Sequence, residues 1–258
     1  MSEVLNFAPG SAEATLLVPL WCRARCAAEY PALGVGEADA LLLKGVRADF
    51  SAARQADCTL YALRETLMLA AAWRCLGEHP GAALIDLGCG LDTVLRRAGG
   101  ELTRRYYVDL PEVIALREKL LPPLPGETYI PADLRAGGWE GRIDAPDGAF
   151  LLMGGLLGHF ERDEALHLLA ALAERFPGGG AAFDGVSALS LALAGRSAGL
   201  KSAMPNPAAL GRTGCFAQLR RVRALPEVFS SLPAGHRLKL GLLMGTGALG
   251  FFEARFAR

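Results

Sequence analysis

The chain has 258 residues, 52% of them hydrophobic, and its 27 basic and 27 acidic residues give a formal net charge of zero. This length and composition predict a globular protein with one sizeable core, and the balanced charge argues against nucleic acid or an anionic membrane surface as partner. The first ten residues lack the basic and apolar regions of a signal peptide, and no apolar run approaches the ~18–20 residues of a membrane span. We therefore expect a cytoplasmic protein.

The six cysteines are scattered, with no C-x-x-C pair and no neighbouring histidine doublet. Most lie among apolar residues, which favours reduced core thiols over disulfides or a zinc site. We predict no metal site.

The N-terminal part is predicted to be helical. Residues 12–30 carry apolar side chains at helical spacing, Pro31 ends the helix, and Pro19 predicts a break or kink inside it. The next predicted elements are a short helix, a loop and a longer helix, at residues 37–44, 44–55 and 57–77.

After Gly81, short apolar strands alternate with helices. The predicted strands are residues 82–85, 105–108, 128–130, 148–153 and 181–184. The predicted helices between them are residues 111–121, which begin with a proline, and 161–176. This alternation predicts an α/β fold with a Rossmann-like, doubly wound parallel sheet.

The C-terminal part departs from this rhythm. Glycine and proline punctuate residues 187–235, where four arginines cluster: Arg212, Arg220, Arg221 and Arg223. A solvated helix face is the ordinary interpretation of these arginines, and a site for an anionic substrate is the alternative. Residues 238–244 and 249–256 are predicted as a hairpin joined at Gly245-Thr246-Gly247, so that the last strand is antiparallel.

A glycine turn follows the first predicted strand, in the run Asp86-Leu87-Gly88-Cys89-Gly90-Leu91-Asp92-Thr93. Gly88 and Gly90 allow a sharp bend and the close approach of a ligand. Asp92 and Thr93 suit the first turn of a helix, whose N–H groups would face the turn. The run is typical of a nucleotide-type cofactor site.

Acidic residues follow the next two strands. Asp109 lies about 20 residues after the glycines, where a carboxylate can bind both ribose hydroxyls, and Asp133 lies beside Leu134, a pair that suits adenine. Each aspartate alone could also be a helix cap or a loop residue. A dinucleotide site would require a glycine where Thr93 stands, so the ordered set favours S-adenosylmethionine over NAD.

Two motifs in the chain resemble the leucine carboxyl methyltransferase family: the glycine turn at 86–93 and Tyr107-Val108-Asp109-Leu110-Pro111-Glu112-Val113. A third, Thr15-Leu16-Leu17-Val18-Pro19-Leu20 followed by Arg23, is similar to the polyketide O-methyltransferase branch of that family. The resemblance implies a class I methyltransferase core of seven strands over 81–258. It also implies a helical lid over 1–80 and a substrate wall over about 187–235.

The resemblance also implies roles for individual residues. Gly88 and Gly90 would pass the methionine part of S-adenosylmethionine, Asp109 would hold the ribose, and Arg64 would bind the methionine carboxylate through its two-pronged guanidinium. The full predicted cofactor-binding set is Arg64, Asp86, Gly88, Cys89, Gly90, Asp109, Leu110, Asp133, Leu134 and Met153.

The chain departs from the family at three positions. Val94 stands where the family has an arginine, Gly154 where it has a glutamate, and His159 where it has a tyrosine. His159 is our candidate catalytic base, although it could instead cap a helix or pack under the lid.

The predicted activity is O-methylation of a small-molecule carboxylate or hydroxyl in secondary metabolism. A family member that binds the cofactor or a partner without catalysis is the alternative, motivated by Val94 and Gly154. An NAD oxidoreductase is disfavoured by Thr93.

Overall fold

The computed structural model describes residues 5–6, 12–34, 36–47, 50, 58–100, 102–188, 191–192, 200–203, 210–211, 213–222, 229–230 and 232–258. None of the helices among these residues is long and apolar enough to cross a bilayer.

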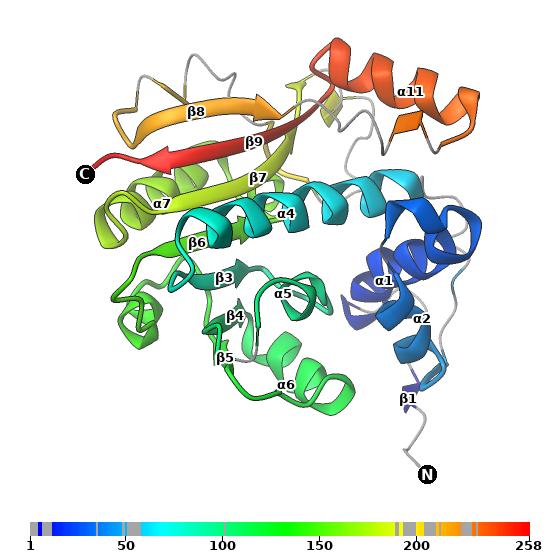
Figure 1. Ribbon diagram of the computed structural model, residues 1–258, viewed down its shortest axis with the longest axis horizontal. Helices are drawn as coiled ribbons and strands as arrows, with labels where there is room; N and C mark the ends of the chain where they lie inside the picture. The colour runs from blue at the N-terminus through cyan, green and yellow to red at the C-terminus, as the bar shows by residue number, and fades with distance from the viewer. Residues whose placement is uncertain are drawn as a thin grey trace.

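Seven strands form one mixed sheet at the centre of the molecule (Figure 1), in the order β5-β4-β3-β6-β7-β9-β8. In that order they are Glu127–Pro131, Arg105–Asp109, Ala83–Leu87, Ala149–Met153, Gly180–Val186, Leu249–Phe256 and Phe216–Val222. Strands β3 to β7 are parallel, and β9 is antiparallel to both β7 and β8. The doubly wound α/β sheet, its five parallel strands and its antiparallel last strand are confirmed.

Helices cover both faces of this sheet. One face packs against α4 (Cys58–Glu78), α5 (Val94–Arg97) and α6 (Pro111–Leu120), and the other against α7 (Arg162–Arg175). Successive side chains of a strand point to opposite faces: Leu84 packs on the α4 side and Ile85 on the α7 side. By the same alternation Asp86, Asp109 and Asp184 all belong to the α4 face.

The N-terminal segment contains α1 (Ala12–Glu29), α2 (Glu37–Leu43) and a small parallel sheet of β1 (Leu5–Asn6) and β2 (Val46–Arg47). These helices lie on the side to which the β3 arrow points in Figure 1. A break or kink was predicted at Pro19, and the break is wrong, because α1 continues through it. Leu17 and Leu20 are buried on either side of the proline, and this packing offsets the cost of the missing N–H.

The other predictions for the N-terminal part were confirmed for the helices and not for the whole of the loop. The helices expected at 37–44 and 57–77 are confirmed as α2 and α4. The loop expected at 44–55 contains β2, and its residues 48–49 and 51–55 lie outside the described part. Although α4 falls inside the segment expected to form the lid, it packs against β6, β7 and β9.

The predicted hairpin is wrong. Residues 238–244 belong to helix α11 (Ala234–Gly245), and the antiparallel partners of β9 are β7 and β8. Strand β8 therefore lies inside the segment expected to form a substrate wall. Because β7 and β8 pair with both edges of β9, no place beside β9 remains for residues 238–244.

Two of the four clustered arginines, Arg220 and Arg221, lie on strand β8, so the predicted helix face is wrong for these two. Arg220 pairs with Glu253 at 2.5 Å, and Arg221 donates to the Leu249 carbonyl at 2.9 Å. Arg212 and Arg223 lie outside the described residues.

Candidate functional site

The glycine turn connects β3 to α5. Gly88 and Gly90 have φ values of +66° and +46°, which side chains with a Cβ rarely adopt. A Cβ on Gly88 would lie 2.6 Å from the Leu156 Cδ1, and one on Gly90 would lie 3.7 Å from the Leu16 Cδ2 of α1. The close approach that requires Gly88 is therefore made by the protein's own Leu156.

Asp109 lies at the end of β4, beside the turn. Its Oδ2 accepts a hydrogen bond from the Gly90 N–H at 2.7 Å, and its Oδ1 accepts one from the Leu110 N–H at 2.8 Å. Burial raises the pKa of this carboxyl, against the effect of those two N–H groups. Each carboxylate oxygen can accept a further bond, so the side chain is held in place and still able to bind hydroxyl groups.

Asp86 lies on β3, behind the turn. Burial, followed by the charge of Asp92, raises the pKa of its carboxyl well above the usual value. Its Oδ2 has no hydrogen-bond partner among the described residues. A buried oxygen left in this state is costly unless a further donor reaches it, which fits a site that takes up a ligand.

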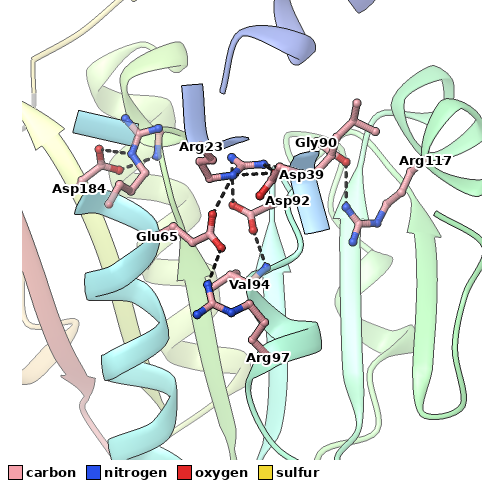
Figure 2. Close-up of polar contacts among 12 residues, drawn as sticks. Arg23, Asp39, Glu65, Gly90, Asp92, Val94, Arg97, Arg117 and Asp184 are labelled. Atoms are coloured by element: carbon pink, nitrogen blue, oxygen red, sulfur yellow. Dashed lines mark hydrogen bonds and ion pairs between the residues drawn. The ribbon is translucent and has the colours of Figure 1, made fainter. Parts of the chain in front are cut away.

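Arg117 of α6 is a residue that our sequence prediction missed. It is fully buried, it donates from Nη1 to the Gly90 carbonyl at 3.0 Å (Figure 2), and its guanidinium lies 4.0 Å from the centre of the Tyr107 ring. Gly90 is thus held at its carbonyl by Arg117 and at its N–H by Asp109. The charged run Arg117-Glu118-Lys119 is typical of an exposed helix end, so the neighbouring sequence does not predict the burial of Arg117.

Arg64 reaches the site from α4. Its Nε donates to Asp184 Oδ2 at 2.9 Å, and the Gly155 N–H donates to Asp184 Oδ1 at 2.5 Å. A Cβ on Gly155 would lie 2.6 Å from the Arg64 Nη1. Since Leu156 contacts Gly88, Arg64 lies against the loop that touches the glycine turn.

Two further predicted residues lie on loops at this edge of the sheet. Asp133 is half-exposed; its Oδ1 accepts from the Arg135 N–H at 3.0 Å and lies 3.4 Å from Arg135 Nη1. His159 lies at the end of the 3₁₀ turn η3 (Leu157–His159), and its carbonyl accepts from Arg135 Nη2 at 3.4 Å. Arg135 therefore links the two predicted residues.

The remaining members of the predicted set differ in exposure. Leu110 is exposed, whereas Cys89 and Leu134 are buried, and burial raises the pKa of the Cys89 thiol. Met153 is fully buried in the core on the α7 side. Because strand residues alternate between faces, its side chain points away from Asp86 and Asp109, and a contact between Met153 and the cofactor stays a prediction.

A buried ion network fixes the N-terminal helices to the turn (Figure 2). Arg23 of α1 lies 2.6 Å from Asp39 of α2, 2.8 Å from Glu65 of α4 and 3.8 Å from Asp92 of the turn. Arg97 of α5 lies 3.1 Å from the other oxygen of Glu65. The network joins four separate segments of the chain, and it places α1 and α2 over the glycine turn.

Apolar contacts support the same docking. Leu17 and Leu20 of α1 pack with Leu91 of the turn and Leu116 of α6. Among the described residues there is no group of three or more His, Cys, Asp or Glu arranged to hold a metal ion.

The network predicts a dependence of stability on pH. Burial raises the pKa of Glu65 to about 8, against the opposing effect of Arg23 and Arg97. The pKa of a glutamate is about 4.3 in the unfolded chain, and below that pH a carboxyl whose pKa is raised in the folded state contributes its full stabilisation. This contribution is lost as the pH rises through the pKa that the carboxyl has in the folded protein. We expect the free energy of unfolding of the wild type to fall from about pH 5 to about pH 8, and this slope to be smaller in Glu65→Gln. Urea unfolding across that range measures both slopes, and identical slopes would contradict the prediction.

The arrangement of strands and helices is that of the class I methyltransferase fold. A putative methyltransferase from Thermobifida fusca superposes with a TM-score of 0.58 over 98% of this chain and 100% of its own, at 18% identity. A DUF574 family protein from Streptomyces avermitilis gives 0.56 over 85% of this chain and 89% of its own, also at 18% identity. Human N-acetylserotonin methyltransferase, solved in complex with SAM, superposes with a TM-score of 0.52 over 78% of this chain and 55% of its own, at 13% identity. At these identities the likeness establishes the fold.

Sequence comparison identifies a relative with a more specific function. The chain is 31% identical over 176 residues to the tetracenomycin polyketide synthesis O-methyltransferase TcmP of Streptomyces glaucescens. That match covers 67% of this chain and 65% of TcmP, which is slightly less than two thirds of the relative's length. No family model matches the chain. The predicted resemblance to the polyketide O-methyltransferase branch is confirmed by this relationship.

Proposed function

We propose that the protein is an S-adenosylmethionine-dependent O-methyltransferase that acts on a carboxylate or hydroxyl of a small molecule in polyketide-like secondary metabolism. The observation that carries this proposal is the Asp109 carboxylate, held by the N–H groups of Gly90 and Leu110. It lies at the carboxyl ends of parallel strands, where folds of this kind bind their ligands. The similarity to TcmP, a polyketide O-methyltransferase, supports oxygen as the methylated atom and a polyketide as the acceptor.

The residues present fit this cofactor. Asp109 offers two oxygens to the ribose hydroxyls, and Arg64 offers a guanidinium to the methionine carboxylate. Asp133, next to buried Leu134, offers an acceptor to the adenine amine, and Asp86 keeps an unpartnered buried oxygen behind the turn. When bound, S-adenosylmethionine supplies an electrophilic methyl group on its sulfonium.

The protein has to position the acceptor and exclude water. An in-line displacement requires the acceptor oxygen to be held about 3–3.5 Å from the methyl carbon. The N-terminal helices, docked over the turn by Arg23 and by the Leu17–Leu91 packing, exclude solvent from one side. A carboxylate acceptor is already ionised and needs no base. A hydroxyl acceptor is activated by a base that takes its proton, and we propose a ring nitrogen of His159 for this step.

A second candidate function is cofactor binding without catalysis. Two observations favour it: residue 154 carries no side chain, and Val94 is buried at the start of α5. Calorimetric titration with S-adenosylmethionine, paired with a methyl-release assay on a panel of acids and phenols, separates the two. Binding with methyl release supports the enzyme, binding without release of methyl to any acceptor supports the second candidate, and no binding contradicts the proposed function.

His159→Gln tests the proposed base. With a phenolic acceptor we expect turnover to fall about 10²-fold or more, because a positioned base contributes about that much, while the Kd for the cofactor stays unchanged. With a carboxylate acceptor turnover should change little. His167→Gln, on the exposed side of α7, is the matched control. Full turnover of His159→Gln with a phenol would exclude the histidine as base.

A further inference from the structure

Asp184 is a buried carboxylate on β7, and the roles proposed above leave it unassigned. It is 4% exposed and lies on the α4 face of the sheet, like Asp86 and Asp109. The sequence gives no sign of it, because the surrounding strand carries small and apolar residues without a recognisable motif.

Both carboxylate oxygens of Asp184 are used inside the protein. Oδ2 accepts from the Arg64 Nε at 2.9 Å, and Oδ1 accepts from the Gly155 N–H at 2.5 Å. Asp184 therefore joins α4 to the loop after β6 (Figure 2). With both oxygens engaged, its effect on any ligand has to pass through Arg64 or Gly155.

The contact with Asp184 determines which N–H groups of the Arg64 guanidinium remain available to a ligand. Nε is occupied, whereas Nη1 and Nη2 have no hydrogen-bond partner among the described residues, and the side chain is 27% exposed. A guanidinium held at Nε still presents the parallel N–H groups of Nη1 and Nη2. That end-on pair matches the two oxygens of a carboxylate.

The neighbouring glycines leave the space in which this free pair lies. A Cβ on Gly155 would lie 2.6 Å from the Arg64 Nη1, and a Cβ on Gly154 would lie 3.2 Å from its Cδ. A side chain at residue 155 would therefore displace the guanidinium, and one at residue 154 would press against the Arg64 side chain. The next residue, Leu156, contacts Gly88, so the free pair lies beside the glycine turn.

We propose that Asp184 is the positioning residue for Arg64, and that it orients the Nη pair toward the α-carboxylate of the cofactor's methionine part. This inference rests on the proposed function, because it assumes S-adenosylmethionine as the ligand.

The test compares two ligands that differ only in the amino-acid part. S-adenosylhomocysteine carries the α-carboxylate, and 5′-deoxy-5′-methylthioadenosine has the same adenosine and sulfur without it. In calorimetric titrations, Asp184→Asn is expected to lose about 10–100-fold in affinity for the first ligand and less than about threefold for the second. Its amide nitrogen would face either the Arg64 Nε or the Gly155 N–H, so one donor is left unpaired.

Two further variants complete the experiment. Glu253→Gln is the matched control, because Glu253 is a carboxylate on the same sheet face that pairs with Arg74 and Arg220, and it should bind both ligands like the wild type. Arg64→Lys keeps the charge without the paired N–H groups, so it should show the same selective loss, and it answers the question if Asp184→Asn does not fold.

The outcomes separate this inference from the proposed function. If the wild type binds neither ligand, the proposed function fails. If the wild type binds both ligands, the positioning role is overturned by an equal loss for the two ligands in Asp184→Asn. Unchanged S-adenosylhomocysteine binding in Asp184→Asn or in Arg64→Lys also overturns it.

Discussion

Asp109→Ala is expected to abolish detectable binding of S-adenosylmethionine, with a rise in Kd of about 10³-fold. The variant removes both proposed acceptors for the ribose hydroxyls, each worth about 1.5–3 kcal/mol when the acceptor is charged. It also leaves the N–H groups of Gly90 and Leu110 without the partners that fix the turn. Isothermal titration calorimetry measures the loss, and circular dichroism shows whether the variant is folded.

Two other variants calibrate this result. Asp109→Asn keeps the shape and one acceptor oxygen, so its Kd should lie between those of the wild type and the alanine variant. Glu112→Ala changes an exposed carboxylate in the first turn of α6 and should bind normally. A folded Asp109→Ala that binds like the wild type would show that the ribose is held elsewhere.

Arg23→Met is expected to lower the free energy of unfolding by about 3–5 kcal/mol. The guanidinium pairs with the buried carboxyl groups of Asp39 and Glu65, and its removal leaves Asp39 without its closest cation. Because the same side chain joins α1 to Asp92 of the glycine turn, the N-terminal helices should also become more accessible to protease. Urea unfolding and limited proteolysis measure the two effects.

Arg25→Met is the matched control for that variant. Arg25 lies on the same helix and pairs with Glu29 one turn later, but both side chains are substantially exposed. Exposed pairs of this spacing contribute about 0.3–0.5 kcal/mol, so unfolding and proteolysis should hardly change. Equal destabilisation of the two variants would show that the buried network does not hold the N-terminal helices.

The parts of the fold that were predicted correctly have local signatures. The apolar strands around Ile85, Val108 and Leu151 are short runs bounded by glycine, proline or acidic residues, and the helices between them follow the 3.6-residue period. The glycine turn and Asp109 also have local signatures. Glycines in a turn and a carboxylate at the end of an apolar strand can both be recognised within a few residues.

The predictions that failed depended on neighbours far away in the sequence. Residues 238–244 contain Leu238 and Leu240 with a polar residue between them, and this alternation is typical of a strand. In the structure they belong to helix α11, and the two antiparallel partners of β9 are β7 and β8. Met153 entered the predicted set through the family resemblance, and only the register of the whole strand shows that its side chain points to the α7 face.

The sequence by itself determined the α/β fold, the glycine turn and the carboxylate at the end of β4, because backbone conformation and hydrophobic period act over a few residues. Only the tertiary structure decided the surroundings of that turn. Arg23, Glu65, Arg117 and Asp184 read as ordinary helix or strand residues, and they come from α1, α4, α6 and β7. Their roles arise because packing buries charges that must then find partners, and those partners are brought together only by the fold.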